Sequence, residues 1–299
     1  MQSLKGLSKA IIANDNDIRK ATMPLDMHGN KYSHGRVLVI GGSFEWRGAT
    51  TMASFAANSA IAALRTVSGF VTVAAPKDVL VNASIRSPVF VLEEMNGKVD
   101  HDIKKIDSIR HDAVVVGPGI QKKNMSSDFL KRLTQIEKRK ENFMIIDAAM
   151  IGFLAEKKDM ISSNMVLTPH TGEFFQLTGI DLKKKNILER IKTAKEFAAK
   201  YGCVILLKGH ETIITDGKRV KVNIAKTPAL ATMGSGDVLC GIIASYIASH
   251  KDPFESAVAG AHLHSTIGDM LFKRKGAHII ATDIIDAIPD VLKRFDVIK

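Results

Sequence analysis

The chain has only two cysteines, Cys203 and Cys240, among its 299 residues. So few cysteines exclude a disulfide scaffold and a cysteine-rich zinc site, and they are typical of a reducing compartment. No uninterrupted apolar run is long enough to span a bilayer. The amino terminus carries lysines, but it has neither the apolar core nor the small-residue cleavage site of a signal peptide. We therefore expect a cytoplasmic protein that makes no membrane contact.

Aromatic residues are also scarce, at 6% of the chain, and Trp46 is the single tryptophan. Stacking platforms for single-stranded nucleic acid are therefore sparse. The basic runs Lys138–Lys140 and Lys183–Lys185 lie in or beside segments with helical apolar spacing, which favours solvated helix faces over a nucleic-acid patch. The net charge of +11 still favours anionic partners. We expect nucleotides or phosphates as ligands, and no nucleic acid.

Hydrophobic residues are plentiful, at 45%, and short β-branched runs alternate with longer helical stretches. The short runs are apolar on both faces, as in parallel strands covered by helices on both sides. This pattern predicts an α/β three-layer fold with a mostly parallel central sheet. The expected strands are Val37–Ile40, Phe70–Ala74, Val89–Leu92, Ala113–Val116, Met144–Ile146, Met165–Leu167, Val204–Leu207 and Thr212–Thr215. The expected helices are Ala49–Leu64, Asp128–Lys138, Ile187–Tyr201, Asp237–Ala248, Phe254–Phe272 and Thr282–Ile288.

No repeat, low-complexity tract or Pro/Gly/Ser-rich linker divides the chain. We therefore expect one domain over residues 26–299. Residues 1–25 are expected to form a loosely attached helix or arm.

Five of the expected strands end on glycine, acid, histidine or lysine. These strand ends are Gly41-Gly42-Ser43, Gly117-Pro118-Gly119, Asp147, Thr168-Pro169-His170 and Lys208-Gly209. Ligands of an open parallel sheet bind outside the carboxyl ends of its strands. A random arrangement would place such residues at both edges, so the pattern indicates an enzyme or a ligand-binding protein.

The motif Gly234-Ser235-Gly236-Asp237 opens a long apolar helix. A glycine-rich turn before a helix presents free backbone N–H groups to an anion, and glycine allows a phosphate to approach closely. Asp237 is either an acid–base group or a helix cap. Its place at a helix N-terminus favours the ionised carboxylate, which weakens it as a base.

Three other residues keep two interpretations each. Lys208 follows an apolar strand and either meets nucleotide phosphates or lies on the surface. His170 either orients a substrate or caps the following helix. Asp147 either holds Mg²⁺ through water or closes a turn.

Six stretches resemble, in order, the NAD(P)H-hydrate dehydratase family of the ribokinase-like superfold. They are GRVLVIGGSFEWRGATTMASFAA, VVVGPGI, MIIDAAM, VLTPHTGEFFQLTG, ILLKGHETIITDG and LATMGSGDVLCGIIA. The resemblance covers residues 35–292, and six motifs in order are specific. Some members of the family carry a fused epimerase domain, and the short stretch before the first motif leads us to expect none here.

The resemblance implies a repair enzyme that dehydrates NADHX or NADPHX, the hydrated forms of NADH and NADPH. It implies ADP or ATP as co-substrate, Mg²⁺ as cofactor, a homotetramer, and a separate epimerase that supplies the S epimer. Asp237 would be the catalytic base that takes the proton of the substrate hydroxyl. The implied nucleotide contacts are Lys208, Gly209, His210, Glu211, Thr212, Gly234, Ser235 and Gly236. The implied substrate contacts are Ala49, Gly119, His170 and Asp237.

The chain departs from the family at two places. Asp147-Ala148-Ala149 stands where Asp-Ala-Asp is usual, and Met233 replaces a residue of a more glycine-rich stretch. These changes concern the nucleotide pocket and the metal contact, and the sequence assigns no set of metal ligands. Two alternatives remain: a ribokinase-like kinase acting on a vitamin or sugar hydroxyl, and a nucleotide-binding regulator without catalysis. The sequence separates neither ADP from ATP nor NADHX from NADPHX.

Overall fold

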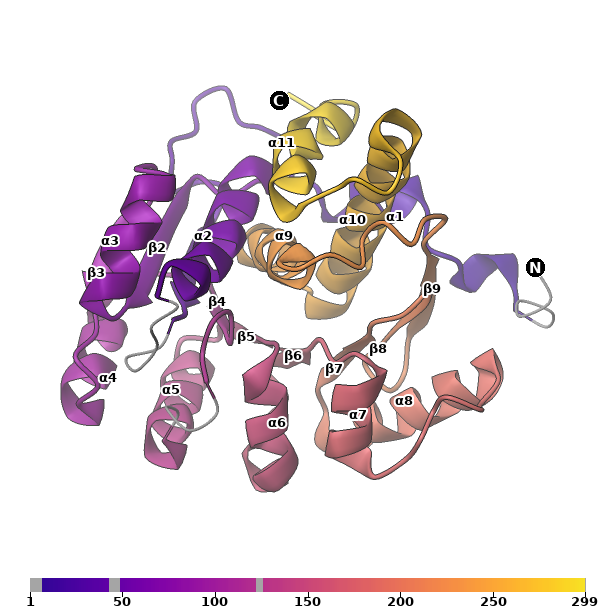
Figure 1. The fold of residues 1–299 in the computed structure, drawn as a ribbon, viewed down its shortest axis with the longest axis horizontal. Helices are drawn as coiled ribbons and strands as arrows, with labels where there is room; N and C mark the ends of the chain where they lie inside the picture. The colour runs from indigo at the N-terminus through magenta and orange to yellow at the C-terminus, as the bar shows by residue number, and fades with distance from the viewer. Residues whose placement is uncertain (1–6, 43–48, 122–125, 299) are drawn as a thin grey trace.

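The computed structural model describes residues 7–42, 49–121 and 126–298, and it confirms the expected α/β fold (Figure 1). Within these residues the strands form one sheet in the order β3-β2-β1-β4-β5-β6-β7-β8-β9. The strands from β3 to β7 run parallel, and β8 and β9 are antiparallel to their neighbours. Their bounds are β1 (Arg36–Ile40), β2 (Phe70–Ala75), β3 (Val91–Glu94), β4 (Ala113–Val116), β5 (Phe143–Ile146), β6 (Met165–Leu167), β7 (Val204–Leu207), β8 (Glu211–Thr215) and β9 (Val220–Ile224).

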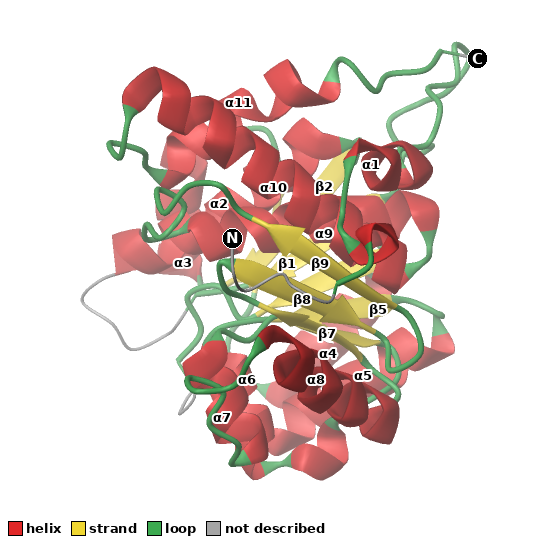
Figure 2. Cartoon of the chain, turned by 90° about the vertical axis from the view of Figure 1, so that its right-hand side faces the viewer, coloured by secondary structure: helices red, strands yellow, loops and turns green. Residues whose placement is uncertain are grey.

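Helices cover both faces of the sheet, which lies between them as a middle layer (Figure 2). On one face lie α4 (Val99–Ser108), α5 (Ser127–Arg139), α6 (Ala149–Glu156), α7 (Thr171–Thr178) and α8 (Ile187–Tyr201), with the short η4 (Lys158–Met160). On the other lie α2 (Ala49–Thr66), α3 (Lys77–Arg86), α9 (Ser235–His250) and α10 (Pro253–Lys275), with α1 (Asp15–Ala21) and α11 (Ala281–Leu292) outside them. The short η2 (Lys9–Ile11) lies beside β9, and its Ile11 packs against the core on the first face. None of the described helices is both long and apolar enough to cross a bilayer.

The strands are apolar on both faces because each face has its own core. Along β1, Val37 and Val39 pack into the core beneath α2, α9 and α10. The alternate residues, Leu38 and Ile40, pack into the core formed with α4 to α8. The expected strands are therefore confirmed in type, and β4, β6 and β7 have the expected bounds.

Some elements differ from the expectation. The third strand begins at Val91 rather than Val89, because the chain bends after Pro88 and pairs with β2 only from Val91 onward. The sequence did not predict β9, nor the helices α3, α4, α6 and α7. Several of these are short, and α6 is apolar on most of its surface, so its helical period is hard to recognise.

The N-terminal segment is packed, whereas the sequence suggested loose attachment. Ile18 of α1 is fully buried against α10. Asp17 forms an ion pair with Lys221 of β9 at 2.9 Å, and Ala13 N donates to Val222 O at 3.0 Å. This segment covers the outer edge of β9, and so satisfies backbone groups that an edge strand would otherwise expose.

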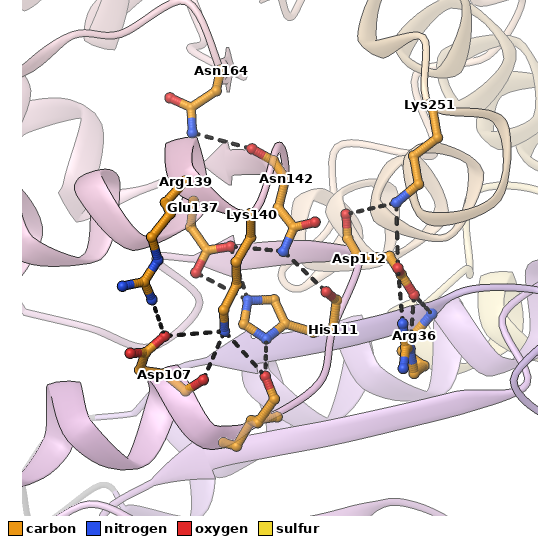
Figure 3. A network of polar contacts seen from close by, with 11 residues as sticks. Arg36, Asp107, His111, Asp112, Glu137, Arg139, Lys140, Asn142, Asn164 and Lys251 are labelled. Atoms are coloured by element: carbon orange, nitrogen blue, oxygen red, sulfur yellow. Dashed lines mark hydrogen bonds and ion pairs between the residues drawn. The ribbon is translucent and has the colours of Figure 1, made fainter.

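A buried polar network ties α5 to the amino ends of β4 and β5 (Figure 3). His111 Nε2 lies 2.9 Å from Glu137 Oε2, and neither side chain is more than 1% exposed. Asn142 Nδ2 donates to Glu137 Oε2 at 3.1 Å and to His111 O at 3.0 Å. The network lies at the edge of the sheet opposite the glycine-rich loops, so it stabilises the fold without taking part in the site below.

Candidate active site

The carboxyl ends of β5, β6 and β7 bring three polar side chains together. Lys208 Nζ lies 2.7 Å from Asp147 Oδ1, and Thr168 Oγ1 donates to the same oxygen at 2.7 Å. Asp147 and Thr168 are buried, while the Lys208 side chain is 25% exposed. The prediction that these strand ends meet at one edge is confirmed.

The charge of Lys208 is maintained by its neighbours. Burial alone lowers the Lys208 pKa, but the carboxylates of Asp147 and Glu173 more than offset it, so the pKa is raised overall. Lys208 is thus a cation held at the sheet edge. The surface-lysine interpretation does not fit this environment.

The glycine-rich turn before α9 lies next to this ion pair. Gly234 has φ +83°, a left-handed conformation that favours glycine, and a Cβ there would come within 2.8 Å of Asn58 Nδ2. A Cβ at Gly236 would stand 3.5 Å from Asp147 Oδ2 and 3.7 Å from Lys208 Nζ. First-turn N–H groups lack intrahelical partners and attract anions. The turn and Lys208 together therefore form a site suited to phosphate.

Asp237 lies in the first turn of α9 and is buried. Gly234 rather than Asp237 holds the N-cap position, and the backbone hydrogen bond that acts on the Asp237 carboxylate comes from its own N–H, so Asp237 is not the cap residue of α9. Burial and the neighbouring Asp147 carboxylate raise the Asp237 pKa to about 8, against the opposing effect of Lys208. We expected the helix N-terminus to favour the ionised form, and burial outweighs that effect. A carboxyl group with this pKa suits a general base near neutral pH.

His170 acts as the cap of α7. Its Nδ1 accepts hydrogen bonds from Gly172 N at 3.0 Å and Glu173 N at 3.1 Å. Glu173 Oε2 in turn accepts from His170 N at 2.8 Å, which completes a capping box. Of the two interpretations for His170, the structure therefore shows capping.

The sequence analysis did not select Glu173, although it contributes to the site. Burial raises the Glu173 pKa, while the Lys208 cation opposes that rise. Glu173 is thus a second carboxylate beside the Lys208–Asp147 pair. The signal that would have found it is its spacing of three residues from the His170 cap.

A cavity of about 800 Å³ opens beside the glycine-rich turn. Seven residues expected to bind nucleotide or substrate line it: His170, Lys208, Gly209, His210, Thr212, Ser235 and Gly236. Apolar side chains such as Leu230 and Leu239 complete its wall. A cavity of this size with a few convergent polar groups is typical of a small-molecule site.

The other expected residues lie outside the lining of this cavity. Glu211 pairs with Arg190 of α8 at 3.4 Å, Nη1 to Oε2. Gly234 and Asp237 are part of the adjoining turn and helix. Ala49 begins α2, and Gly119 follows β4, so both lie on the β1 and β4 side of the edge. Ser43, Trp46 and Gly48 fall outside the described residues.

The loop after β5 explains how Asp147 is held. A Cβ at Gly117, where φ is +138°, would come within 2.2 Å of Asp147 O, so only glycine fits there. Ala148 has φ +53°, which is uncommon for a residue with a Cβ and places strain beside the site. Ala149, at the position where the family has a second acid, begins α6. No group of three or more His, Cys, Asp or Glu among the described residues has the geometry of a metal site.

His264 of α10 is another cavity residue that the sequence analysis missed. Its Nε2 lies 3.1 Å from Ser235 Oγ in the glycine-rich turn. Burial lowers the His264 pKa to about 4, so the imidazole is neutral at physiological pH. His264 therefore braces the turn without adding a charge. Its position inside a long helix gives no local sequence signal.

The sheet order and the anion site before α9 define a ribokinase-like α/β protein. The crystal structure of an ADP/ATP-dependent NAD(P)H-hydrate dehydratase from Bacillus subtilis, co-crystallised with ATP and Mg²⁺, has a TM-score of 0.77. It is 24% identical and covers 97% of this chain and 100% of that one. This likeness shows the fold and confirms the predicted fold class.

The family profile of NAD(P)H-hydrate dehydratases matches residues 37–290, and the chain belongs to that family. The ADP-dependent (S)-NAD(P)H-hydrate dehydratase of Nitrosopumilus maritimus is 32% identical over 278 residues, 89% of this chain and 91% of that protein. The bifunctional NAD(P)H-hydrate repair enzyme of Pyrobaculum aerophilum is 36% identical over 270 residues, 89% of this chain. The chain spans about half the length of this and similar bifunctional relatives, 52% here. The predicted family is confirmed.

Proposed function

We propose that the protein restores NADH and NADPH from their hydrated S forms, using ADP or ATP. The observation that carries this proposal is the buried Asp237, placed at an anion-binding turn beside the Lys208–Asp147 pair. A regulator that only binds nucleotide has no need of a buried carboxyl group at that place. The names of the relatives favour dehydration over the phosphorylation of a vitamin or sugar.

The chemistry requires a better leaving group than hydroxide. The 6-hydroxyl oxygen of the substrate attacks the terminal phosphorus of the nucleotide, and Asp237 takes the hydroxyl proton. The bond from that phosphorus to the bridging oxygen breaks and releases AMP or ADP. The lone pair of the ring nitrogen then expels phosphate from C6, and loss of a proton from C5 restores the 5,6 double bond.

The residues around the cavity divide between the two ligands. We assign Lys208, Gly209, His210, Glu211 and Thr212 to the nucleotide, with Glu211 acting through the shape of its loop because its side chain faces Arg190. The N–H groups of Gly234 and Gly236 would stabilise charge on the phosphoryl group during transfer, and Ser235, whose N–H donates to Thr232 O at 3.2 Å, would face the nucleotide from the cavity wall. Lys208 would meet the donor phosphates as a point charge.

The hydrated nicotinamide would lie toward the β1 and β4 side of the edge. The strand order changes direction there, since β1 lies between β2 and β4, and ligands of open α/β sheets bind at such a point. Gly42 N donates to Pro118 O at 3.0 Å and so holds the two loops together. Ala49 and Gly119 are the contacts that we assign to this substrate at that side, and His170, which lies beside Lys208 in the wall of the cavity, is the contact that we assign to it from the nucleotide side.

Magnesium fits the donor set as a phosphate-bound ion. Mg²⁺ is usually held by one or two carboxylates together with substrate phosphates and water, and it neutralises charge on the phosphates. Asp147 and Glu173 are two such carboxylates, and both interact with Lys208. We also propose a cytoplasmic homotetramer that works with a separate epimerase.

One assay tests the proposal directly. Purified protein is incubated with hydrated NADH and Mg²⁺, with ADP, with ATP or without nucleotide, while the absorbance of reduced nicotinamide is followed. We expect absorbance to rise only with nucleotide, and AMP or ADP to form in equal amount. A stable phosphate ester of another alcohol, with no restored NADH, would instead identify a small-molecule kinase.

A further inference from the structure

The N-terminal segment, residues 8–21, lies along the outer edge of β9, at the side of the sheet that faces the viewer in Figure 2. It holds two successive residues of that strand, Lys221 through Asp17 and Val222 through the Ala13 amide. The following residue of β9, Asn223, belongs to the wall of the cavity. The segment therefore reaches the neighbourhood of the nucleotide site.

Asn223 is connected to the segment through a histidine of α10. His262 Nδ1 lies 3.2 Å from Asn223 Oδ1, and His262 Nε2 lies 3.1 Å from Asp15 Oδ1 of α1. Asn223 Nδ2 donates to Ala261 O at 3.2 Å, and only nitrogen can donate to a carbonyl, so the amide has one orientation. Ser265 Oγ donates to the same Asn223 Oδ1 at 3.2 Å.

These contacts decide which polar group Asn223 presents to the cavity. Its Oδ1 lies within hydrogen-bond distance of two groups of α10, His262 Nδ1 and Ser265 Oγ, and an imidazole that carries both ring hydrogens donates to Asn223 Oδ1 and to the Asp15 carboxylate at once. Its Nδ2 has two hydrogens, and in the described part of the chain only one of them has an acceptor. A molecule in the cavity therefore meets an N–H donor at Asn223 rather than a carbonyl oxygen.

We propose that the N-terminal segment positions the nucleotide cavity: Asp15 holds His262, and His262 turns the Asn223 amide so that its N–H faces the bound nucleotide. The matching group on the ligand is an acceptor, an oxygen or a ring nitrogen of the nucleoside. Without His262 the amide oxygen loses one of its partners, while the bond from Nδ2 to Ala261 O remains, so the N–H is held less firmly toward such an acceptor. The inference rests on the proposed function for the identity of the ligand.

The test uses ADP binding by calorimetry to the full chain. His262→Phe removes the donor to Asn223 Oδ1, and we expect ADP affinity to fall about two- to tenfold, the worth of one hydrogen bond. Asp15→Ala should weaken ADP binding in the same direction, whereas Asp15→Asn keeps an amide that pairs with the imidazole and should restore it. In steady-state assays with hydrated NADH, the KM for ADP should change more than kcat.

The matched control is Lys221→Met. This substitution removes the ion pair between Asp17 of the segment and Lys221 of β9, which does not involve His262. Lys221 is not part of the cavity wall. We expect a lower melting temperature with unchanged ADP affinity. This control separates a general anchoring of β9 from the specific path through His262.

A double-mutant cycle completes the test. In an Asn223→Ala background, His262→Phe should have no further effect on ADP affinity, because the group that it orients is gone. Additive losses, or a His262→Phe protein that binds ADP as the wild type does, would overturn the inference.

Should His262→Phe not fold, equal ADP affinities of Asp15→Ala and Asp15→Asn would overturn it, since Asp15 is exposed enough to tolerate both. A wild-type protein that binds neither ADP nor ATP would contradict the proposed function itself.

Discussion

Lys208 Nζ lies 2.7 Å from Asp147 Oδ1, and this ion pair joins the ends of two strands that β6 separates. Thr168, at the end of β6, donates to the same carboxylate oxygen. Three adjacent strand ends are thereby tied together through one atom. The arrangement keeps a cation at the place where phosphates would arrive, while the carboxylate prevents that cation from being buried alone.

Lys208→Ala should weaken nucleotide binding and leave the fold intact. The loss of one charged hydrogen-bond partner is worth ~1.5–3 kcal/mol, or roughly ten- to a hundredfold in affinity. Calorimetric titration with ADP measures it, with circular dichroism as the control for folding. Unchanged affinity would show that Lys208 serves only to hold Asp147.

ADP should support turnover at least as well as ATP and should yield AMP. Among the described residues that line the cavity, Lys208 and Lys226 are the only lysines or arginines, so no dedicated set of cations surrounds a third phosphate. Product analysis by chromatography distinguishes AMP from ADP as the spent nucleotide. Activity with ATP alone, with ADP only as an inhibitor, would contradict this prediction.

The buried pair of His111 and Glu137 should respond very differently to two substitutions. His111 Nδ1 faces Ile109 O at 2.9 Å and must carry a hydrogen, so a neutral imidazole offers Nε2 as an acceptor. Glu137→Gln supplies an N–H to that nitrogen and an oxygen to Asn142. Glu137→Ala removes the partner of His111 Nε2 and one of the two acceptors of Asn142 Nδ2, and we expect each unsatisfied group to cost about 1–3 kcal/mol of unfolding free energy.

Urea denaturation of the wild type and both variants measures these free energies, provided that the slope with urea stays constant. We expect Glu137→Gln to unfold close to the wild-type midpoint. Equal losses in the two variants would show that the ionised carboxylate itself is required, and so would contradict this account of the network.

The fold could be predicted in outline because the buried strands of a parallel sheet are recognisable in the sequence as short apolar runs. The runs that became β4, β6 and β7 are apolar throughout and are flanked by polar residues or by glycine and proline. β9 carries Lys221 and alternates, and its burial comes from α10 and the N-terminal segment, which are remote in the sequence. A short stretch of sequence around β9 does not show that these remote segments bury it.

The same distinction holds for the site. Lys208 and Gly236 could be selected because they stand at the end of a strand and the start of a helix, where ligands bind. Asn223 and His264 lie inside regular elements, where a polar residue resembles any other partly buried side chain. The raised pKa of Asp237 also follows from tertiary burial, which outweighs the local effect of the helix end.

Activity and stability should depend on pH in opposite directions through Asp237. Its pKa of about 8 means that kcat/KM rises as pH increases through about 8, because the base must be ionised. The unfolded aspartate ionises near ~3.9, so the folded state holds the proton more tightly, and stability falls by ~1.4 kcal/mol per pH unit between the two values. Unfolding measured against pH should show this slope in the wild type and not in Asp237→Asn.

Asp237→Asn separates catalysis from structure most clearly. The asparagine has the same size and lacks the charge whose burial is unfavourable, so the variant should fold with at least native stability at neutral pH. It should still bind ADP, because the N–H groups of the turn and Lys208 are unchanged. The amide does not accept the hydroxyl proton, and turnover of hydrated NADH should therefore fall by ~10²–10⁴-fold, the usual contribution of a positioned acid–base group.

The measurement is the rate of NADH formation at saturating ADP, with calorimetry on the same preparation as the control for binding. Retention of most of the wild-type rate would show that substrate and nucleotide react by positioning alone, and that Asp237 is not the base.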